Sequence, residues 1–91
     1  LGKYGMLRKR FLKEHRKGTY AGLVLNGTLQ AHLLEIDQTA RTQVEQTMQQ
    51  MAEAEGVTEV LKAADQMAWV GRMNNIKNRA EEMVLNDLIY S

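Results

Sequence analysis

The feature that most constrains the fold is a long apolar stripe with the spacing of an α-helix. Within the segment 28–55, apolar residues recur at intervals of three or four for about seven turns. These residues are Leu29, Leu33, Ile36, Ala40, Val44, Met48 and Met51. The opposite face is rich in Gln, Thr and Glu, which suits contact with water. We therefore expect one amphipathic helix that begins after Thr28 and is roughly 40 Å long at about 1.5 Å per residue.

A second stripe of the same kind lies in the segment 66–90, after the expected N-cap Asp65. Its members are Trp69, Met73, Ile76, Ala80 and Met83, widened by Val70, Val84 and Leu88. Two such stripes cover each other when their helices pair in an antiparallel hairpin. Because the stripes are long and thin for so short a chain, we expect some apolar surface to remain for a partner chain, such as a second copy in a homodimer.

Three shorter segments, 3–17, 19–26 and 58–64, complete the expected helices, and Thr19 and Thr58 are suitable N-caps for the last two. We expect Gly18, Gly27 and Gly56 to end the helices before them in a left-handed conformation. The chain has no proline. The sequence therefore predicts an all-α fold in a single domain, residues 1–91. It is a small helical bundle in which two long antiparallel helices are joined by two or three short ones, and its N-terminal helix is basic.

Composition and spacing offer no catalytic or metal-binding set. With no cysteine, the chain has no disulfide framework, thiolate zinc site or cysteine nucleophile. His15 and His32 lie in different segments, and neither has a carboxylate or a second histidine four residues on, whereas a metal site usually needs three or four ligands. Glu81 and Glu82 point in different directions on a helix. We therefore expect a protein that is not an enzyme and that holds no cofactor or metal.

Several methionines have the spacing of a soft binding groove, but adaptable core packing is the commoner role of such residues. They are Met48, Met51, Met67, Met73 and Met83. No apolar run approaches the roughly 20 residues that span a bilayer, and no signal peptide is visible. We therefore expect a cytoplasmic protein without a membrane partner. Because the chain begins with Leu1 rather than Met, we also expect it to be a fragment of a longer chain.

The charge is divided unevenly along the chain. Residues 1–18 carry seven basic residues and one acidic residue, a net charge of +6, whereas the remainder carries five basic and ten acidic residues, a net charge of −5. A helix with so many cations can neutralise DNA phosphates and position a protein on the duplex without reading its sequence. The candidate DNA-binding residues are Arg8, Lys9, Arg10, Lys13, Arg16 and Lys17. The alternatives are a solvated arm folded against the acidic body and a helix lying on an anionic membrane.

Two further patterns are weaker candidates for DNA contact. The turn Asn26-Gly27 fits a helix-turn-helix, but the helix after it offers Gln30 and His32 without any Arg or Lys, and acidic residues follow. On the last helix, a polar strip includes side chains that can read base edges, although exposed polar helix surface is more common. The strip consists of Arg72, Asn75, Asn78 and Arg79, with Lys77 nearby.

Several strings of the chain resemble the transposon-encoded TnpV family over nearly its whole length. They are residues 4–8 (YGMLR), 11–16 (FLKEHR), 20–33, 55–58 (EGVT), 63–70, 73–76 (MNNI) and 79–82 (RAEE), of which the strings after residue 55 are the most specific. The resemblance implies an accessory protein of a bacterial mobile genetic element, in an excisionase-like or regulatory role, and it brings no catalytic residues. It also implies DNA, a recombinase or another element-encoded protein as partners. The alternative is a helical protein–protein interaction module or adaptor with no direct DNA contact.

Overall fold

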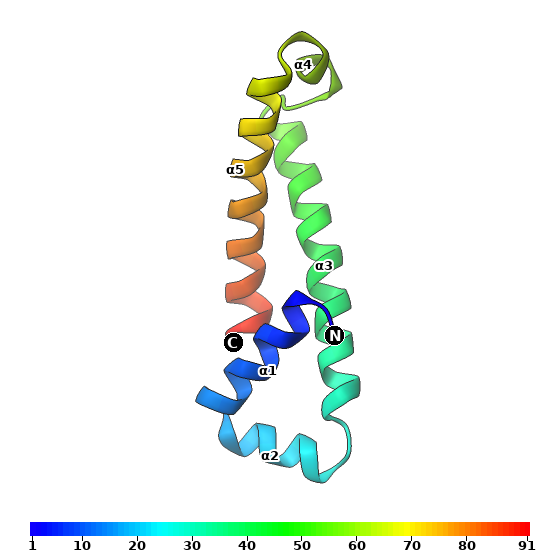
Figure 1. Cartoon of the computed structure of the whole chain (residues 1–91), viewed down its shortest axis with the longest axis vertical. Helices are drawn as coiled ribbons and strands as arrows, with labels where there is room; N and C mark the ends of the chain where they lie inside the picture. Colours follow the sequence, from blue (N-terminus) through cyan, green and yellow to red (C-terminus); the bar gives the residue numbers. More distant parts are fainter.

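The computed structural model describes all of residues 1–91 and is an elongated helical molecule of 55 × 19 × 18 Å (Figure 1). It contains no strand, which confirms the predicted all-α class. The helices are α1 (Lys3–His15), α2 (Lys17–Leu25), α3 (Leu29–Ala54), α4 (Glu59–Ala64) and α5 (Gln66–Val84), and α5 continues into the π-helical turn η1 (Leu85–Ile89). No helix combines the length and the apolarity needed to cross a bilayer.

The two long helices, α3 and α5, run antiparallel along the length of the molecule, and α4 lies at the end where they connect (Figure 1). Their facing sides form the core, as the apolar stripes predict. The buried apolar residues of the two helices are Leu33, Ala40 and Val44 on α3 and Ile76, Ala80 and Val84 on α5. Ala40 and Ala80 belong to one buried cluster and have no exposed surface.

The stripe on α5 differs from the prediction at two positions, Val70 and Met83, and Val70 has 44% of its surface exposed. Met83 was expected in the core, but 51% of its surface is exposed, whereas its neighbour Val84 is buried. Successive buried positions on α5 are four residues apart, at Ile76, Ala80 and Val84. Because 3.6 residues make a turn, positions 83 and 84 flank the same line down the helix, and the packing against α3 selects the second of them.

Two of the three glycines end a helix as predicted. Gly27 and Gly56 have φ values of 70° and 71°, the left-handed conformation that glycine adopts without a Cβ clash. The prediction for Gly18 was wrong, because α2 begins at Lys17 and Gly18 lies inside it. The turn between α1 and α2 is made instead at Arg16, with φ −140° and ψ 56°.

The N-cap predictions were also confirmed only in part. Asp65 accepts the backbone N–H of Ala68 at 3.1 Å, as expected of a capping side chain. Thr28 and Thr58 occupy the N-cap positions of α3 and α4, but neither side chain makes a capping hydrogen bond. Thr19 caps nothing, because it lies inside α2. Helix positions were therefore easier to predict than the side-chain contacts at the helix ends.

The N-terminus of α1 is held by a residue of α3. The backbone N–H of Gly5 donates to Oδ1 of the buried Asp37 at 2.9 Å, and Oδ2 of Asp37 accepts from Arg41 at 2.7 Å. A Cβ on Gly5 would lie 3.1 Å from the carbonyl oxygen of Leu33, so glycine is what lets the two helices approach this closely. The contact fixes α1 across the hairpin at the end opposite α4 (Figure 1).

Candidate nucleic-acid interface

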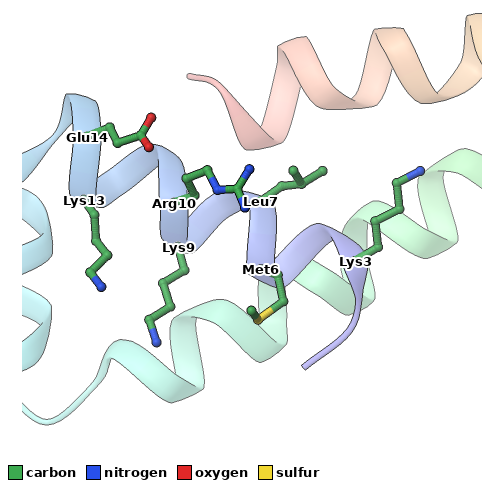
Figure 2. Close-up of a pocket in the computed structure, with 7 residues that line it drawn as sticks. All are labelled: Lys3, Met6, Leu7, Lys9, Arg10, Lys13 and Glu14. Atoms are coloured by element: carbon green, nitrogen blue, oxygen red, sulfur yellow. The ribbon is translucent and has the colours of Figure 1, made fainter.

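One side of α1 carries three of the six predicted DNA-binding cations, Lys9, Arg10 and Lys13. We call this surface the basic face, and it is lined by Lys3, Met6, Leu7, Lys9, Arg10, Lys13 and Glu14 (Figure 2). Residues three and four apart share one side of a helix, which explains why this set comes from α1 alone. In Figure 2, the side chains of Lys9 and Lys13 extend to the same side of α1. The result is an open, mostly cationic surface around a small apolar centre.

Most of these cations are not paired with the acidic body. Lys3 contacts Glu81 of α5 at 2.6 Å, and Oε2 of Glu81 also accepts the hydroxyl of Tyr4 at 3.0 Å. The remaining ion pairs of the molecule join Asp37 to Arg41 and Glu55 to Arg79, and the carboxylate of Glu14 lies 3.8 Å from the His15 ring. Lys9, Arg10, Lys13, Arg16 and Lys17 therefore form no ion pair. Folding the N-terminal segment onto the body neutralises Lys3 by direct contact and leaves the other cations without a carboxylate partner.

The Lys3–Tyr4–Glu81 contact joins α1 to α5 and changes the protonation of its members. The hydrogen bond from Lys3 is the main cause that holds the pKa of Glu81 below its ordinary value. Burial, followed by the hydrogen bond to Glu81, raises the pKa of Tyr4 to about 12. Both effects favour the ionised carboxylate and the neutral phenol that the contact requires.

Arg8 differs from the other predicted cations because its guanidinium points toward the C-terminus of the chain. Its Nη1 donates to the carbonyl oxygens of Ile89 at 2.9 Å and Ser91 at 3.0 Å. Ile89 is the last residue of η1, so the guanidinium lies at the C-terminal end of a helix, where a positive charge is favourable. Burial, and then repulsion by Arg16, lower the pKa of Arg8. The structure thus places Arg8 in the packing of α1 against η1 and away from the basic face.

His32, on α3, completes the surroundings of Arg8. Its Nε2 lies 3.5 Å from Nε of Arg8. Burial, and then the neighbouring charge of Arg8, lower the pKa of His32, so the imidazole is kept neutral and can accept from the guanidinium. The histidines remain in separate places, and no three His, Asp or Glu side chains gather as metal ligands would.

An aromatic cluster lies beside the basic face, where α1 meets the C-terminal end of the chain. The ring of Phe11 is 5.6 Å from that of Tyr90 and 5.3 Å from that of His15, measured between centroids. The guanidinium of Arg16 lies 5.2 Å from the Phe11 centroid, within the range of a cation–π contact. A cleft of about 320 Å³, which we call the aromatic cleft, is lined by Leu7, Arg10, Phe11, Glu14, His15 and Tyr90.

The aromatic cleft was missed by sequence reasoning. Phe11 and Tyr90 lie near opposite ends of the chain, and the spacing of residues within a helix carries no information about which distant helix end will approach it. The one feature of the sequence that could have indicated the cleft is that both aromatic residues belong to segments with an exposed face. An aromatic side chain at such a place often contacts another element or a ligand.

The polar strip on α5 is not one free surface. Arg79 donates from Nε to Oδ1 of Asn75 at 2.9 Å and from Nη2 to Oε1 of Glu55 at 2.8 Å. The hydrogen bond from Arg79 lowers the pKa of Glu55. Arg79 therefore connects α5 to Glu55 at the end of α3, and Asn75 holds the Arg79 side chain from within α5. Arg72 and Lys77 are exposed and form no ion pair.

Comparison with known families now decides the identity of the chain. The family model described as transposon-encoded protein TnpV matches residues 1–89. This chain belongs to the TnpV family. The match confirms the resemblance carried by its sequence strings, and it makes this TnpV-family chain a transposon-encoded protein. No curated protein and no solved structure gave a match, so the surfaces described above are interpreted from their own chemistry.

Proposed function

We propose that this TnpV-family chain is a non-enzymatic accessory protein of its transposon that binds duplex DNA through the basic face of α1. The observation that supports the proposal is the open row of cations, Lys9, Arg10 and Lys13, none of which is paired with a carboxylate of the chain. Arg16 and Lys17 extend the positive surface past the end of α1. The Arg8 guanidinium, which is bonded to Ile89 and Ser91, is left out of this surface.

The physical basis of binding is the release of counterions from the phosphates. Duplex DNA carries one negative charge per about 1.7 Å of its axis, and each phosphate that a lysine or arginine neutralises frees condensed cations. Contacts of this kind fix where and how a protein sits on DNA, and they carry no sequence information directly. In this proposal the chain positions DNA for a recombinase encoded by the same element, in an excisionase-like or regulatory role.

The test compares two double variants of equal charge change in a salt series on a 20-base-pair duplex. Lys9→Ala with Lys13→Ala removes two cations of the basic face, and Arg72→Ala with Lys77→Ala removes two exposed cations of α5. We expect the first pair to weaken binding and to reduce the slope of log affinity against log salt by about two. We expect the second pair to leave both quantities nearly unchanged.

Two results would contradict the proposal. The first is no binding of the unaltered chain at low salt. The second is a loss of affinity in the Arg72 and Lys77 double variant that equals or exceeds the loss in the Lys9 and Lys13 double variant. That result would place the DNA-binding surface on the strip of α5. Circular dichroism of both double variants shows whether the helical fold is retained, so that loss of binding is not confused with unfolding.

A second candidate function is a protein-interaction module without DNA contact. It is supported by Val60 and Met67 at the α4 end of the molecule, where 79% and 87% of their surfaces are exposed. Apolar side chains this exposed at one end are suited to a protein partner, including a second copy of the chain. Light scattering after size exclusion at high micromolar concentration tests the homodimer. A monomer mass would contradict it, and a dimer mass lost in Val60→Thr with Met67→Gln would support it.

A further inference from the structure

The aromatic cleft and the basic face are continuous. Three residues, Leu7, Arg10 and Glu14, line both of them. A strand of DNA whose phosphates rest on the basic face therefore lies directly beside a cleft walled by the rings of Phe11, His15 and Tyr90. In a nucleotide, the phosphate and the base are joined through one sugar. One nucleotide can therefore place its phosphate on the basic face and its base in the adjoining cleft.

The chemistry of the cleft fits a flat, uncharged ring more closely than another phosphate. Tyr90 has 44% of its surface exposed, and the side chain of His15 is 60% exposed, so both rings have free surface. Phe11 is half-buried, already contacts Arg8 and Arg16, and lies next to the rings of His15 and Tyr90. The stacking of bases on aromatic side chains tolerates any sequence because every base has a π-face.

We propose that the aromatic cleft receives an unpaired nucleobase of a DNA strand whose phosphates lie on the basic face. The inference rests on the proposed function, because the strand must first be held by α1. Bases of a perfect duplex are stacked and paired, and taking one out of the stack costs a few kcal/mol, least where the base is already unpaired. The cleft thus distinguishes bulged, gapped or single-stranded DNA from paired duplex.

Glu14 adds a preference among bases. Its carboxylate lines the cleft as well as the basic face and lies 3.8 Å from His15. A carboxylate repels phosphate and accepts a hydrogen bond from an exocyclic amine, such as N4 of cytosine. An unpaired cytosine is therefore a better occupant than an unpaired thymine, which presents a carbonyl oxygen at the same position.

The experiment measures affinity by fluorescence anisotropy for three probes: a paired 20-base-pair duplex, the same duplex with one unpaired cytosine, and the same duplex with one unpaired thymine. We expect the bulged cytosine probe to bind at least about 5-fold more tightly than the paired duplex, in line with the energy of stacking one base. Tyr90→Leu should abolish this preference and leave paired-duplex affinity within about 2-fold. Tyr20→Leu, the same change at a tyrosine outside the cleft, should keep the preference.

The outcomes separate this inference from the proposed function. Equal affinity for the three probes, or a preference that survives in Tyr90→Leu, overturns the cleft as a base site and leaves DNA binding by the basic face intact. Absence of binding to all three probes overturns the proposed function and the cleft with it. If Tyr90→Leu fails to fold, His15→Ala replaces it, because this exposed ring can be removed with little effect on packing, and the same loss of preference is expected.

Discussion

The amide of Gly5 and the carboxylate of Asp37 form a helix cap between two helices: α3 supplies the acceptor that the N-terminus of α1 lacks. Gly5 is the third residue of α1, and its N–H is one of the four that a helix leaves without a partner. The preceding N-cap residue, Gly2, has no side chain to accept it. Asp37 takes over this role at 2.9 Å, and its charge also faces the positive end of the α1 dipole.

Removal of this cap should destabilise the protein. We expect Asp37→Ala to lower the free energy of unfolding by about 1–3 kcal/mol, because it deprives the Gly5 amide of its acceptor inside the protein and Arg41 of its partner. Asp37→Asn keeps an acceptor oxygen and should cost less. Urea denaturation followed by circular dichroism measures both variants. A loss below about 0.5 kcal/mol in Asp37→Ala would contradict the interpretation.

Gly5 should be intolerant of the smallest side chain, for a different reason. The Cβ of Gly5→Ala would meet the Leu33 carbonyl oxygen at 3.1 Å, so α1 must move away from α3, at a cost of about 1–3 kcal/mol. Gly18→Ala is the matched control, because a Cβ there meets nothing within 4 Å and alanine favours a helix by up to about 1 kcal/mol. In urea denaturation, we expect Gly5→Ala to lower the free energy of unfolding and Gly18→Ala to raise it or leave it unchanged.

Arg8 and Arg10 lie two residues apart on α1, but their substitution should affect different properties: stability at Arg8 and DNA affinity at Arg10. Arg8→Gln removes the donor to the Ile89 and Ser91 carbonyls and should lower stability by about 1–2 kcal/mol. Arg10→Gln should leave stability within about 0.5 kcal/mol and weaken binding to duplex DNA at low salt. Thermal unfolding and DNA-binding anisotropy, measured on both variants, test the prediction. It would be refuted if Arg8→Gln weakened DNA binding alone and Arg10→Gln lowered stability alone.

The raised pKa of Tyr4 predicts a loss of stability in alkali. The unfolded chain releases the phenol proton near pH 10, whereas the folded protein holds it until about pH 12, so stability falls as pH rises above 10. At pH 11 this one group should have lost about 1 kcal/mol relative to pH 8. Tyr4→Phe should lack this part of the decline, whereas Tyr20→Phe should decline as the unaltered chain does. Parallel curves for Tyr4→Phe and the unaltered chain would contradict the prediction.

The sequence predicted the regular parts of this fold because periodicity follows directly from helix geometry. In the stripe from Leu33 to Val44, Leu33, Ala40 and Val44 are buried and Ile36 is partly buried, as their spacing predicts. Periodicity could not decide between Met83 and Val84, since the choice depends on how α5 turns toward α3. It also could not tell that Gly18 would continue a helix, because glycine permits a left-handed turn without requiring one.

The candidate site was predictable only as a charged segment. Seven cations within residues 1–18 are visible in the sequence, and periodicity places Lys9 and Lys13 on one side of a helix. The inward role of Arg8 depends on where the last residues of the chain lie, which no local pattern contains. For the same reason, the pairing of Phe11 with Tyr90 required the three-dimensional structure.

The attachment of α1 to residues 81–90 also sets an order in which the fold can be completed. Lys3, Arg8 and Phe11 precede their partners, Glu81, Ile89 and Tyr90, by roughly 80 residues. Domains usually acquire structure from the N-terminus onward during synthesis, and α1 can contact Asp37 of α3 early, but its contacts with α5 and η1 must wait until residues 81–90 have been made. A chain terminated before these residues would therefore lack the partners that fix its cationic surface in place.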